Sequence, residues 1–575
     1  MHRSSDQTAD GPDSFPTDPA GLPEASRPRT LDVSDGETVE LRIAPVAKRV
    51  GDVAVRMLAY GGSIPGPTLR VAEGSEITVH AENEGDLEAT IHWHGLRLDN
   101  RYDGTHATQA PIPVGGSFTY RLSFPDPGVY WYHPHIREDY GQELGLYGNI
   151  LVVPRDPGYW PAAHREVALT LDDVLIEDGR IAPFSRTETN FAAMGRFGNV
   201  LLVGGETDLA LEAQRGEVVR LYLTNTANTR VFDVALPGAQ MKLVGGDSGR
   251  YERETFVDSV VLAPSERVVV DVLFEQPGRL TLAHRTPERT YPLATIVVGD
   301  ESASPPLGEV FATLRENPEW AEERRRLAAH ATAKPDKTLA FVAELNLGVP
   351  DGPVVYACPM HPDVMSEEPG HCPECGMALV AQAVASFVCP MHPDVVSKTP
   401  GHCPECGMKL LPAELVARAT AEDAHGGGHD HHGGGEGGGD GIEWEDDMVA
   451  VNRITTPENT RWQLVDRATG AINEEIDWRF RVGDRVKLRL VNELASDHPM
   501  HHPFHVHGAG RFVVLARDGT PEENLVWKDT VLVRTGETVD VLLDVTQPGV
   551  WMAHCHIAEH HESGMMLSFT VDPAD

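Results

Sequence analysis

The sequence predicts an all-β protein made of three copies of one β-sandwich, with a small insertion rich in Cys and His. Short, Val-rich segments alternate with Gly, Pro, Asn and Asp, and little helical periodicity is present before residue 300. Three stretches, 70–84, 212–228 and 479–493, share a turn, a β-rich strand and a terminal Asn. Each is followed by a second shared element, in 114–135, 262–285 and 534–556. Such internal repetition indicates one structural unit used three times.

Length, charge and hydropathy limit the possible functions. A chain of 575 residues is too long for a single hydrophobic core. The net charge of -39 argues against nucleic acids and anionic membrane surfaces as partners. No run of 18 apolar residues is present, so we expect no membrane span. The polar N-terminus lacks an apolar signal segment, which indicates a cytoplasmic protein or one whose signal is absent from this sequence.

Composition also predicts the order of domains. Pro305 and Pro306 interrupt the β-rich texture, and Asn317 and Pro318 are suited to begin a helix. The second copy ends in His284-Arg285 without a His-x-His pair, so we expect a spacer without a metal site. The expected units are a disordered leader (1–36), a first sandwich (37–160), a second sandwich (161–304), a linker helix (305–336), a third sandwich (337–347 and 442–575), an insertion (348–412) and a Gly/His-rich linker (413–441).

The C-terminal stretch 554–566 carries the strongest chemical signal. On a strand, His554 and His556 face one way and Cys555 faces the other. His560 and Met565 follow closely, and a thiolate, imidazoles and a weak thioether are the ligands of a blue-copper electron-transfer site. One strand can therefore serve two metal sites.

Further His-x-His pairs supply imidazoles for the second site. With the pair around Cys555 they make eight rings, enough for three copper ions. His502 precedes His505 by an odd offset, so it faces away from that pair and supplies the imidazole missing from the Cys555 site. The other three pairs are His92 and His94, His133 and His135, and His505 and His507.

With these motifs, the chain resembles the three-domain multicopper oxidases, the family of laccases, bilirubin oxidases and copper-efflux oxidases. The resemblance covers about residues 40–304 and 442–573. It implies three cupredoxin-like Greek-key sandwiches and four copper ions, with a three-copper cluster between the first and last sandwich. The implied ligands are His502, Cys555, His560 and axial Met565 for type 1; His92 and His505 for type 2; and His94, His133 and His556 with His135, His507 and His554 for the binuclear type 3 pair.

The resemblance also implies the reaction and its acids. A substrate gives single electrons to the type 1 copper, and four electrons reduce dioxygen to water at the cluster, which consumes protons. Family enzymes place an Asp after the first His pair, which Asp103 matches. Copper-efflux oxidases carry a Glu directly after the last type 1 histidine, but this chain has His561 there and Glu562 one later. Asp103 and Glu562 are therefore the candidate catalytic acids.

The insertion contains a tandem repeat, 356–377 and 387–408. Each copy offers three cysteines to a soft metal: zinc if a histidine completes a tetrahedron, copper(I) if sulfur dominates. The repeats resemble the small heavy-metal-binding domain of copper and silver efflux proteins. Zinc-stapled miniature folds without a transport role are the alternative. The candidates are Cys358, Met360, His361, His371, Cys372, Cys375 and Met377, and then Cys389, Met391, His392, His402, Cys403, Cys406 and Met408.

The position of the insertion favours cuprous ion as substrate and a role in copper homeostasis. Copper-efflux oxidases carry a methionine-rich insertion at a similar position, where it handles cuprous ions. A laccase-like oxidase of small phenols, with modules that load copper, is one alternative. A metal-sequestering protein with incidental oxidase activity is another. We expect a monomer that uses dioxygen, and the family usually works outside the cytoplasm.

Overall fold

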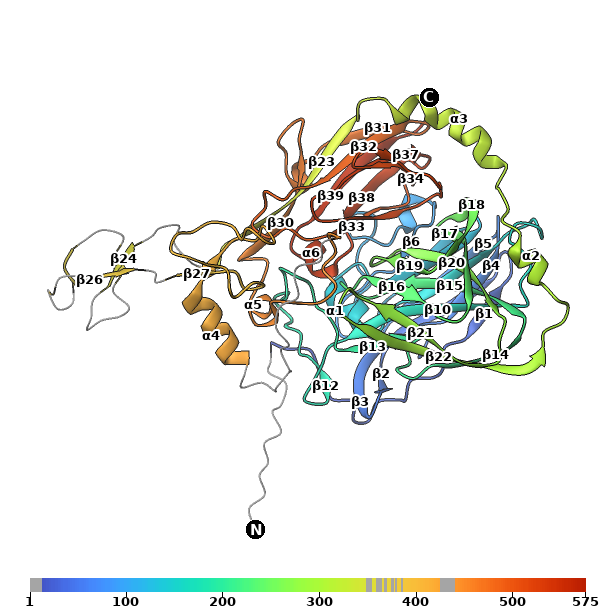
Figure 1. The fold of residues 1–575 in the computed structure, drawn as a ribbon, viewed down its shortest axis with the longest axis horizontal. Coiled ribbons are helices and arrows are strands. Elements are labelled where there is room, and N and C mark those ends of the chain that lie inside the picture. The colour runs from blue at the N-terminus through green and yellow to red at the C-terminus, as the bar shows by residue number, and fades with distance from the viewer. Residues whose placement is uncertain are drawn as a thin grey trace, which may run out of the picture.

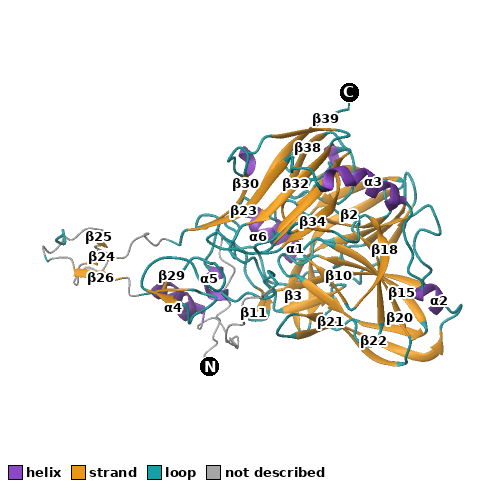
Figure 2. Ribbon diagram, turned by 45° about the horizontal axis from the view of Figure 1, so that its top comes forward, coloured by secondary structure: helices purple, strands orange, loops and turns teal. Residues whose placement is uncertain are grey.

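The computed structural model describes residues 13–347, 354–357, 365–366, 370–373, 377, 380–383, 386–423 and 440–574. Three β-sandwiches form the main body, and the part of the insertion with β24, β26 and β27 projects from one side (Figure 1). Strands dominate and the helices are few and mostly short (Figure 2). Among the described residues, no helix is long and apolar enough to cross a membrane.

The first sandwich packs the sheet β3-β2-β5-β7 against the sheet β1-β4-β9-β8-β6. Its strands are β1 (Thr30–Val33), β2 (Thr38–Val50), β3 (Val53–Tyr60), β4 (Thr68–Ala72), β5 (Glu76–Asn83), β6 (His92–His94), β7 (Ser117–Ser123), β8 (Gly128–His133) and β9 (Gly148–Val153). The helices α1 (Glu138–Glu143) and η1 (Asn100–Tyr102) lie in its loops.

The second sandwich packs β13-β10-β15-β20-β17-β18 against β14-β22-β21-β16-β19. Its strands are β10 (Arg165–Val174), β13 (Val200–Val203), β14 (Ala210–Arg215), β15 (Glu217–Asn225), β16 (Phe232–Ala235), β17 (Gln240–Gly246), β18 (Gly249–Val257), β19 (Ser259–Leu262), β20 (Arg267–Phe274), β21 (Gly278–Arg285) and β22 (Thr290–Ser302). The strands β11 (Ile176–Glu177) and β12 (Arg180–Ile181) form a small hairpin.

The third sandwich packs β30-β23-β32-β37-β34-β35 against β31-β39-β38-β33-β36. Its strands are β23 (Lys337–Leu345), β30 (Thr460–Asp466), β31 (Trp478–Arg481), β32 (Arg485–Asn492), β33 (His502–Val506), β34 (Gly510–Arg517), β35 (Thr520–Pro521), β36 (Thr530–Val533), β37 (Thr538–Val545), β38 (Gly549–Cys555) and β39 (Met566–Asp572). The helices α5 (Val449–Arg453), η2 (Asn473–Glu475) and α6 (Ala558–Glu562) accompany it.

The sequence repeats occupy equivalent places in the three sandwiches. The first repeated block forms β5, β15 and β32, and each pairs in parallel with an earlier strand, β2, β10 or β23. The second block provides β7, β20 and β37, each antiparallel to the first block's strand. Equal topology explains why the same sequence pattern recurs at these positions.

Between the second and third sandwiches the chain forms two helices, α2 (Gly308–Ala312) and α3 (Glu319–Ala331). Pro318 is the N-cap of α3, and the Asn317 side chain accepts a hydrogen bond from the Glu319 amide at 3.3 Å. Trp320 and Leu327 of α3 are buried in a small apolar cluster with Val513 and Leu542 of the third sandwich. The helix therefore covers an outer face of that sandwich (Figure 2).

Two predictions of irregular chain need correction. The leader was expected to be disordered to residue 36, but β1 pairs with β4, and Phe15 is buried with its ring stacked on Tyr140 at 3.8 Å. Residues 413–423, expected to be linker, form the helix α4 (Ala413–Asp423). Its Ala, Leu, Glu and Arg are strong helix formers, and Ala419 is buried in the core of the third sandwich.

Candidate metal centres

Strand pairing gathers the eight predicted cage histidines from the first and third sandwiches. His92 of β6 lies opposite His133 of β8, and His505 of β33 lies opposite His554 of β38. Directly opposed residues of antiparallel strands have side chains in contact, so each pairing joins two His-x-His motifs. All eight rings are at most 2% exposed: His92, His94, His133, His135, His505, His507, His554 and His556.

The two sandwiches meet through these rings. His94 stacks on His505 with ring centroids 3.8 Å apart, and His92 lies 4.1 Å from His507. Candidate ligand nitrogens fall within 4.8 Å of one another in three overlapping sets: His92, His505 and His507; His92, His94 and His133; and His135, His507 and His554. These sets share members and contain seven of the rings, and the His556 ring lies 5.0 Å from those of His94 and His133. The eight rings therefore form one continuous cage, which we name the histidine cage.

Hydrogen bonds fix which nitrogen of each ring faces the interior. The Nδ1 atoms of His92, His133 and His505 lie 2.7, 2.9 and 2.9 Å from the carbonyl oxygens of Asp103, Pro134 and Asp529. A carbonyl only accepts, so these nitrogens carry the proton, and each Nε2 keeps a lone pair. Those three Nε2 atoms are buried with no hydrogen-bond partner among the described residues. Orphaned imidazole nitrogens with the opposite nitrogen anchored to the protein are what metal ligation requires, and the cage therefore fits copper ions.

The cage also keeps its imidazoles neutral. Burial, followed by the neighbouring rings, lowers the pKa of His94 and His505 well below the usual value, and the pKa of His92 to about 3. Desolvation disfavours the imidazolium, and neighbouring imidazoles disfavour it further. A neutral ring has the lone pair that a metal ion needs.

A second donor set lies on the opposite face of β38. The Cys555 sulfur is 3.4 Å from His502 Nδ1 and 3.7 Å from His560 Nδ1. Met565 is fully buried in the same core, and its carbonyl accepts a hydrogen bond from the Cys555 amide at 3.1 Å. Burial raises the pKa of the Cys555 thiol, so a bound cation is needed to hold the thiolate. One thiolate and two imidazoles within reach of one point fit copper.

Aromatic and backbone groups enclose this Cys555 site. Trp462 stacks on His560 with centroids 3.9 Å apart, and Phe341 stacks on His502 at 5.2 Å. His560 Nε2 donates to the carbonyl of Ala193, from the second sandwich, at 3.1 Å. Neither His502 nor His560 is more than 1% exposed. An electron donor in solution therefore has no direct contact with either ring.

Both predicted acids lie near the histidine cage, at different distances from its rings. Asp103 is 1% exposed, and its Oδ2 is 2.9 Å from His507 Nδ1. Burial raises the pKa of Asp103 to about 6. Glu562 contacts the amide of Glu138 at 3.1 Å, and burial, followed by Asp139, raises its pKa to about 7. Glu562 therefore contacts the backbone beside the cage rather than one of its rings.

Sequence reasoning missed Glu138, a further carboxylate in contact with a cage ring. It is fully buried on α1, with Oε1 2.7 Å from His133 Nδ1 and Oε2 3.0 Å from His561 Nδ1. Burial opposes its charge, but His133 and His556 lower its pKa well below the usual value. Its position three residues after His135 was the only available signal.

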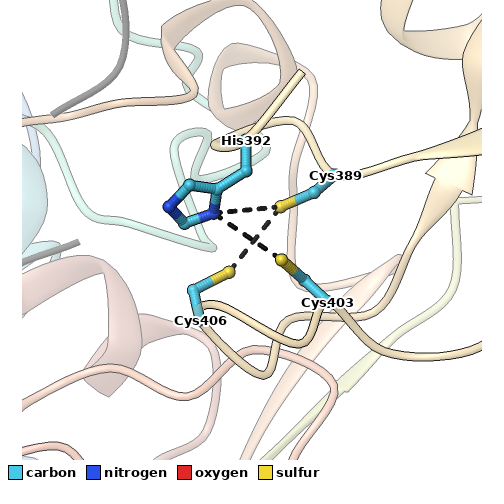
Figure 3. Close-up of side chains that lie close together, drawn as sticks. All are labelled: Cys389, His392, Cys403 and Cys406. Atoms are coloured by element: carbon cyan, nitrogen blue, oxygen red, sulfur yellow. Dashed lines mark hydrogen bonds between the residues drawn. The ribbon is translucent and has the colours of Figure 1, made fainter. Parts of the chain in front are cut away.

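The second inserted repeat forms a compact set of four ligand atoms, which we name the module site (Figure 3). The Cys389 sulfur lies 3.6 Å from the Cys406 sulfur, and His392 Nδ1 lies 3.7 Å from the sulfurs of Cys389 and Cys403. All four candidate ligand atoms lie within 4.8 Å of one another. Hydrogen bonding from Cys406 lowers the pKa of the Cys389 thiol to about 5. Three sulfurs and one imidazole fit a closed tetrahedral site.

Other candidates of the insertion are placed differently. The exposed His402 lies outside the module site, with Nε2 3.5 Å from Asp497. Met391 and Met408 are buried with Cys389 and Cys403 of the module site in the core of the third sandwich. In the first repeat Cys372 is buried, whereas His371 and Met377 are exposed. The remaining candidates of that repeat lie outside the described residues: Cys358, Met360, His361 and Cys375.

The strands β24 (Val354–Ala357), β25 (Met365–Ser366) and β26 (Val380–Ala383) form a small sheet in the first repeat. The second repeat has a matching sheet of β27 (Phe387–Val388), β28 (Val396–Ser397) and β29 (Leu411–Pro412). In both, the first strand lies between the other two, which agrees with a duplicated unit.

Comparison with protein families decides the assignment. Residues 45–157 and 445–575 match two models described as multicopper oxidase, and residues 355–382 and 387–413 match the heavy metal binding domain. The chain belongs to the multicopper oxidase family. It is therefore an oxidoreductase that uses copper ions, dioxygen as acceptor and a reductant.

Relatives of this multicopper oxidase include enzymes and copper resistance proteins. It is 26% identical to the multicopper oxidase MmcO of Mycobacterium tuberculosis over 573 residues, 94% of this chain and 88% of the relative. A copper resistance protein A homolog of Pseudomonas syringae pv. tomato is 26% identical over 47% of this chain and 52% of its own length. The fold resembles that of the Campylobacter jejuni multicopper oxidase, a metallo-oxidase, with a TM-score of 0.61, 18% identity and 96% and 98% coverage.

Proposed function

We propose that this multicopper oxidase oxidises cuprous ion and serves copper homeostasis. Four cuprous ions each lose one electron, and one dioxygen with four protons becomes two waters. The observation that carries the proposal is the contact between the module site and the loop that leads into His502. The printed name of the copper resistance relative agrees with such a role.

The contact is formed by the chain directly after Cys406. The amide of Lys409 donates to the Asp497 carbonyl at 2.8 Å, and Lys409 Nζ lies 3.3 Å from the Asp497 carboxylate. Gly407 has φ +78°, and a Cβ there would be 3.2 Å from Pro499. Only glycine adopts this conformation readily at so close an approach. Four residues then separate Asp497 from His502.

Soft donors continue across this contact. Met391 and Met408 from the module share one core with Met500 and with the type 1 candidates Cys555 and Met565. Thiolates and thioethers select cuprous copper over harder ions. These soft donors on the two sides of the contact support cuprous ion as the substrate.

The enclosed type 1 region also favours an ion over a phenol. Trp462, Phe341 and the Ala193 carbonyl surround His560 and His502, so a phenol would remain outside this layer. A small ion needs less room than a phenol. We therefore propose that phenols are secondary substrates.

The proposed ligands are those that the family resemblance implies. His502, Cys555, His560 and Met565 would hold the type 1 copper, and His92 and His505 would hold the type 2 copper. His94, His133 and His556 would hold one ion of the type 3 pair, and His135, His507 and His554 would hold the other. Bound copper would supply the one-electron chemistry and the binding of dioxygen. The protein orients these ligands, excludes water by burial and holds protons at Asp103.

Removing ligands of the module site tests the proposal. Replacing Cys403 and Cys406 by Ser should lower the rate of cuprous oxidation severalfold while phenol oxidation stays within twofold. Met391 and Met408 are buried in the core of the third sandwich, so deleting 352–440 would also expose apolar surface. Point variants avoid this effect. The exposed Lys398→Ala variant serves as control. Equal losses with both substrates would refute the cuprous role.

A further inference from the structure

A buried arginine at the start of β20 joins all three sandwiches next to the histidine cage. Arg267 is fully buried, and its guanidinium forms two hydrogen bonds to Asp529 of the third sandwich, at 2.7 and 2.5 Å. Its Nε donates to the carbonyl of Val129 in the first sandwich at 3.0 Å. Arg267 Nη1, which makes the 2.7 Å bond to Asp529, also donates to the carbonyl of Ser265 at 2.8 Å. Such a two-pronged contact fixes both position and orientation of a carboxylate.

Asp529 in turn contacts two rings of the histidine cage. Its Oδ1 is 2.9 Å from His94 Nε2, and its carbonyl accepts from His505 Nδ1 at 2.9 Å. These rings come from different sandwiches and stack on each other. His94 Nδ1 is left buried without a partner among the described residues. The Asp529 carboxylate, with Thr530 Oγ1 at 3.1 Å, holds His94 Nε2, so His94 presents Nδ1 to the interior of the cage. His505 Nδ1 is held by the backbone carbonyl of Asp529, with the carboxylate oxygen 3.6 Å away, so His505 presents Nε2.

The chain makes room for this contact at the glycine after His94. Gly95 has φ +84°, and a Cβ there would lie 2.5 Å from Asp529 Oδ2 and 2.8 Å from an Arg267 nitrogen. Any other residue would push the ion pair away from the cage. The backbone at this point therefore depends on glycine for both its conformation and its space.

Further charged side chains surround the Arg267–Asp529 ion pair. The backbone amide of Arg267 donates to Asp247 at 2.9 Å, and Lys528 bridges Asp247 and Glu266 at 3.2 Å each. Two cations thus face three carboxylates in a buried cluster. The excess negative charge lies beside the place where metal cations would bind.

We propose that Arg267 is a positioning residue for the histidine cage, acting through Asp529 on His94 and His505. The second sandwich supplies no proposed ligand, yet it sets the geometry of two. This inference rests on the ligand assignment made under the proposed function, and it does not depend on the substrate. The proposal adds a positioning role to the second sandwich, which the sequence predicts to be a spacer without a metal site.

The test compares two buried arginines of the second sandwich. Arg267→Lys keeps the charge but cannot hold both Asp529 oxygens. Arg220→Lys makes the same change at a matched control, because Arg220 is buried and contacts both oxygens of Asp271 at 2.8 and 2.9 Å. Copper per chain, the type 2 electron paramagnetic resonance signal and the blue type 1 absorption are measured during dialysis against a chelator.

We expect Arg267→Lys to release cage copper at a chelator concentration tenfold to a hundredfold lower, which is the usual effect of losing a group that orients a ligand. The blue absorption should persist, since Cys555 lies on the other face of β38. Arg220→Lys should behave as the unmodified protein. If Arg267→Lys does not fold, Asp529→Asn should show the same selective loss.

Retention of all cage copper together with the type 2 signal in the Arg267 or Asp529 variant, or equal loss in Arg220→Lys, would overturn the inference. An unmodified protein without type 1 and type 2 signals would instead refute the ligand assignment itself. The substrate preference is measured separately, so failure of the cuprous proposal leaves this result interpretable.

Discussion

Glu138 Oε2 lies 3.0 Å from His561 Nδ1, and both side chains are buried between the first and third sandwiches. His561 stands where the resemblance to copper-efflux oxidases implies a glutamate, and the carboxylate that it contacts, Glu138, lies on α1. Electrostatic attraction to Glu138 raises the pKa of His561 although burial opposes it.

The first prediction separates Glu138 from Glu562. Glu138→Gln should slow reoxidation of the fully reduced enzyme by dioxygen about tenfold to a hundredfold, because it removes the carboxylate that contacts His133. Glu562→Gln should have an effect below about threefold, since an amide oxygen also accepts the bond from the Glu138 amide. Stopped-flow recovery of the blue absorption measures both. The reverse order of effects would make Glu562 the important acid.

The second prediction concerns Asp103. Asp103→Asn should slow oxygen reduction by about a hundredfold, the usual contribution of a positioned acid, and leave the blue absorption unchanged. Asp99→Asn is the matched control, because Asp99 is nearby in sequence but contacts Arg101 at the surface. Unchanged turnover in Asp103→Asn would remove this carboxyl from the mechanism.

The third prediction concerns the module site. The full chain should bind a metal through Cys389, His392, Cys403 and Cys406, protecting these thiols from alkylation. Chelation should expose them, and Cys403→Ser should lower the metal content by one ion per chain at unchanged type 1 absorption. Elemental analysis and thiol titration measure this. Free reactivity of all three thiols in the metal-loaded protein would contradict the site.

The fourth prediction concerns pH. Burial, opposed by Arg196, raises the pKa of Glu143 from 4.5 to about 8. The folded state then keeps a proton that the unfolded state loses between these values, so the free energy of unfolding falls as pH rises, by at most about 1.4 kcal/mol per pH unit. In Glu143→Gln the slope should become shallower, because the contribution of Glu143 is lost. Chemical unfolding at pH 5 to 9 measures it, and parallel curves for both proteins would contradict the assignment.

Local sequence motifs predicted much of the candidate site. His502, Cys555 and His560 meet, and the His-x-His pairs join in one cage, because strand geometry and short offsets determine where these side chains point. Groups that reach the cage across sandwich boundaries were not predictable. Arg267 lies 262 residues before Asp529, and no local pattern connects them. Glu138 meets His561 only because α1 and α6 pack together.

The fold prediction was likewise most accurate where strand periodicity and the repeated sequence blocks coincide. Three equal strand arrangements follow from the three repeated blocks. The leader and α4 were misjudged because their structure depends on tertiary burial: Phe15 packs on Tyr140, and Ala419 enters the core of the third sandwich. Polar composition indicates disorder only where no such contact exists.

The stoichiometry of oxygen uptake tests the central claim most directly. With cuprous ion as the reductant and both reactants followed together, we expect four electrons consumed per dioxygen without accumulation of hydrogen peroxide. Cys555→Ser should abolish this turnover because it removes the thiolate of the type 1 site. A ratio of two electrons per dioxygen with peroxide as product, or undiminished turnover in Cys555→Ser, would contradict the account.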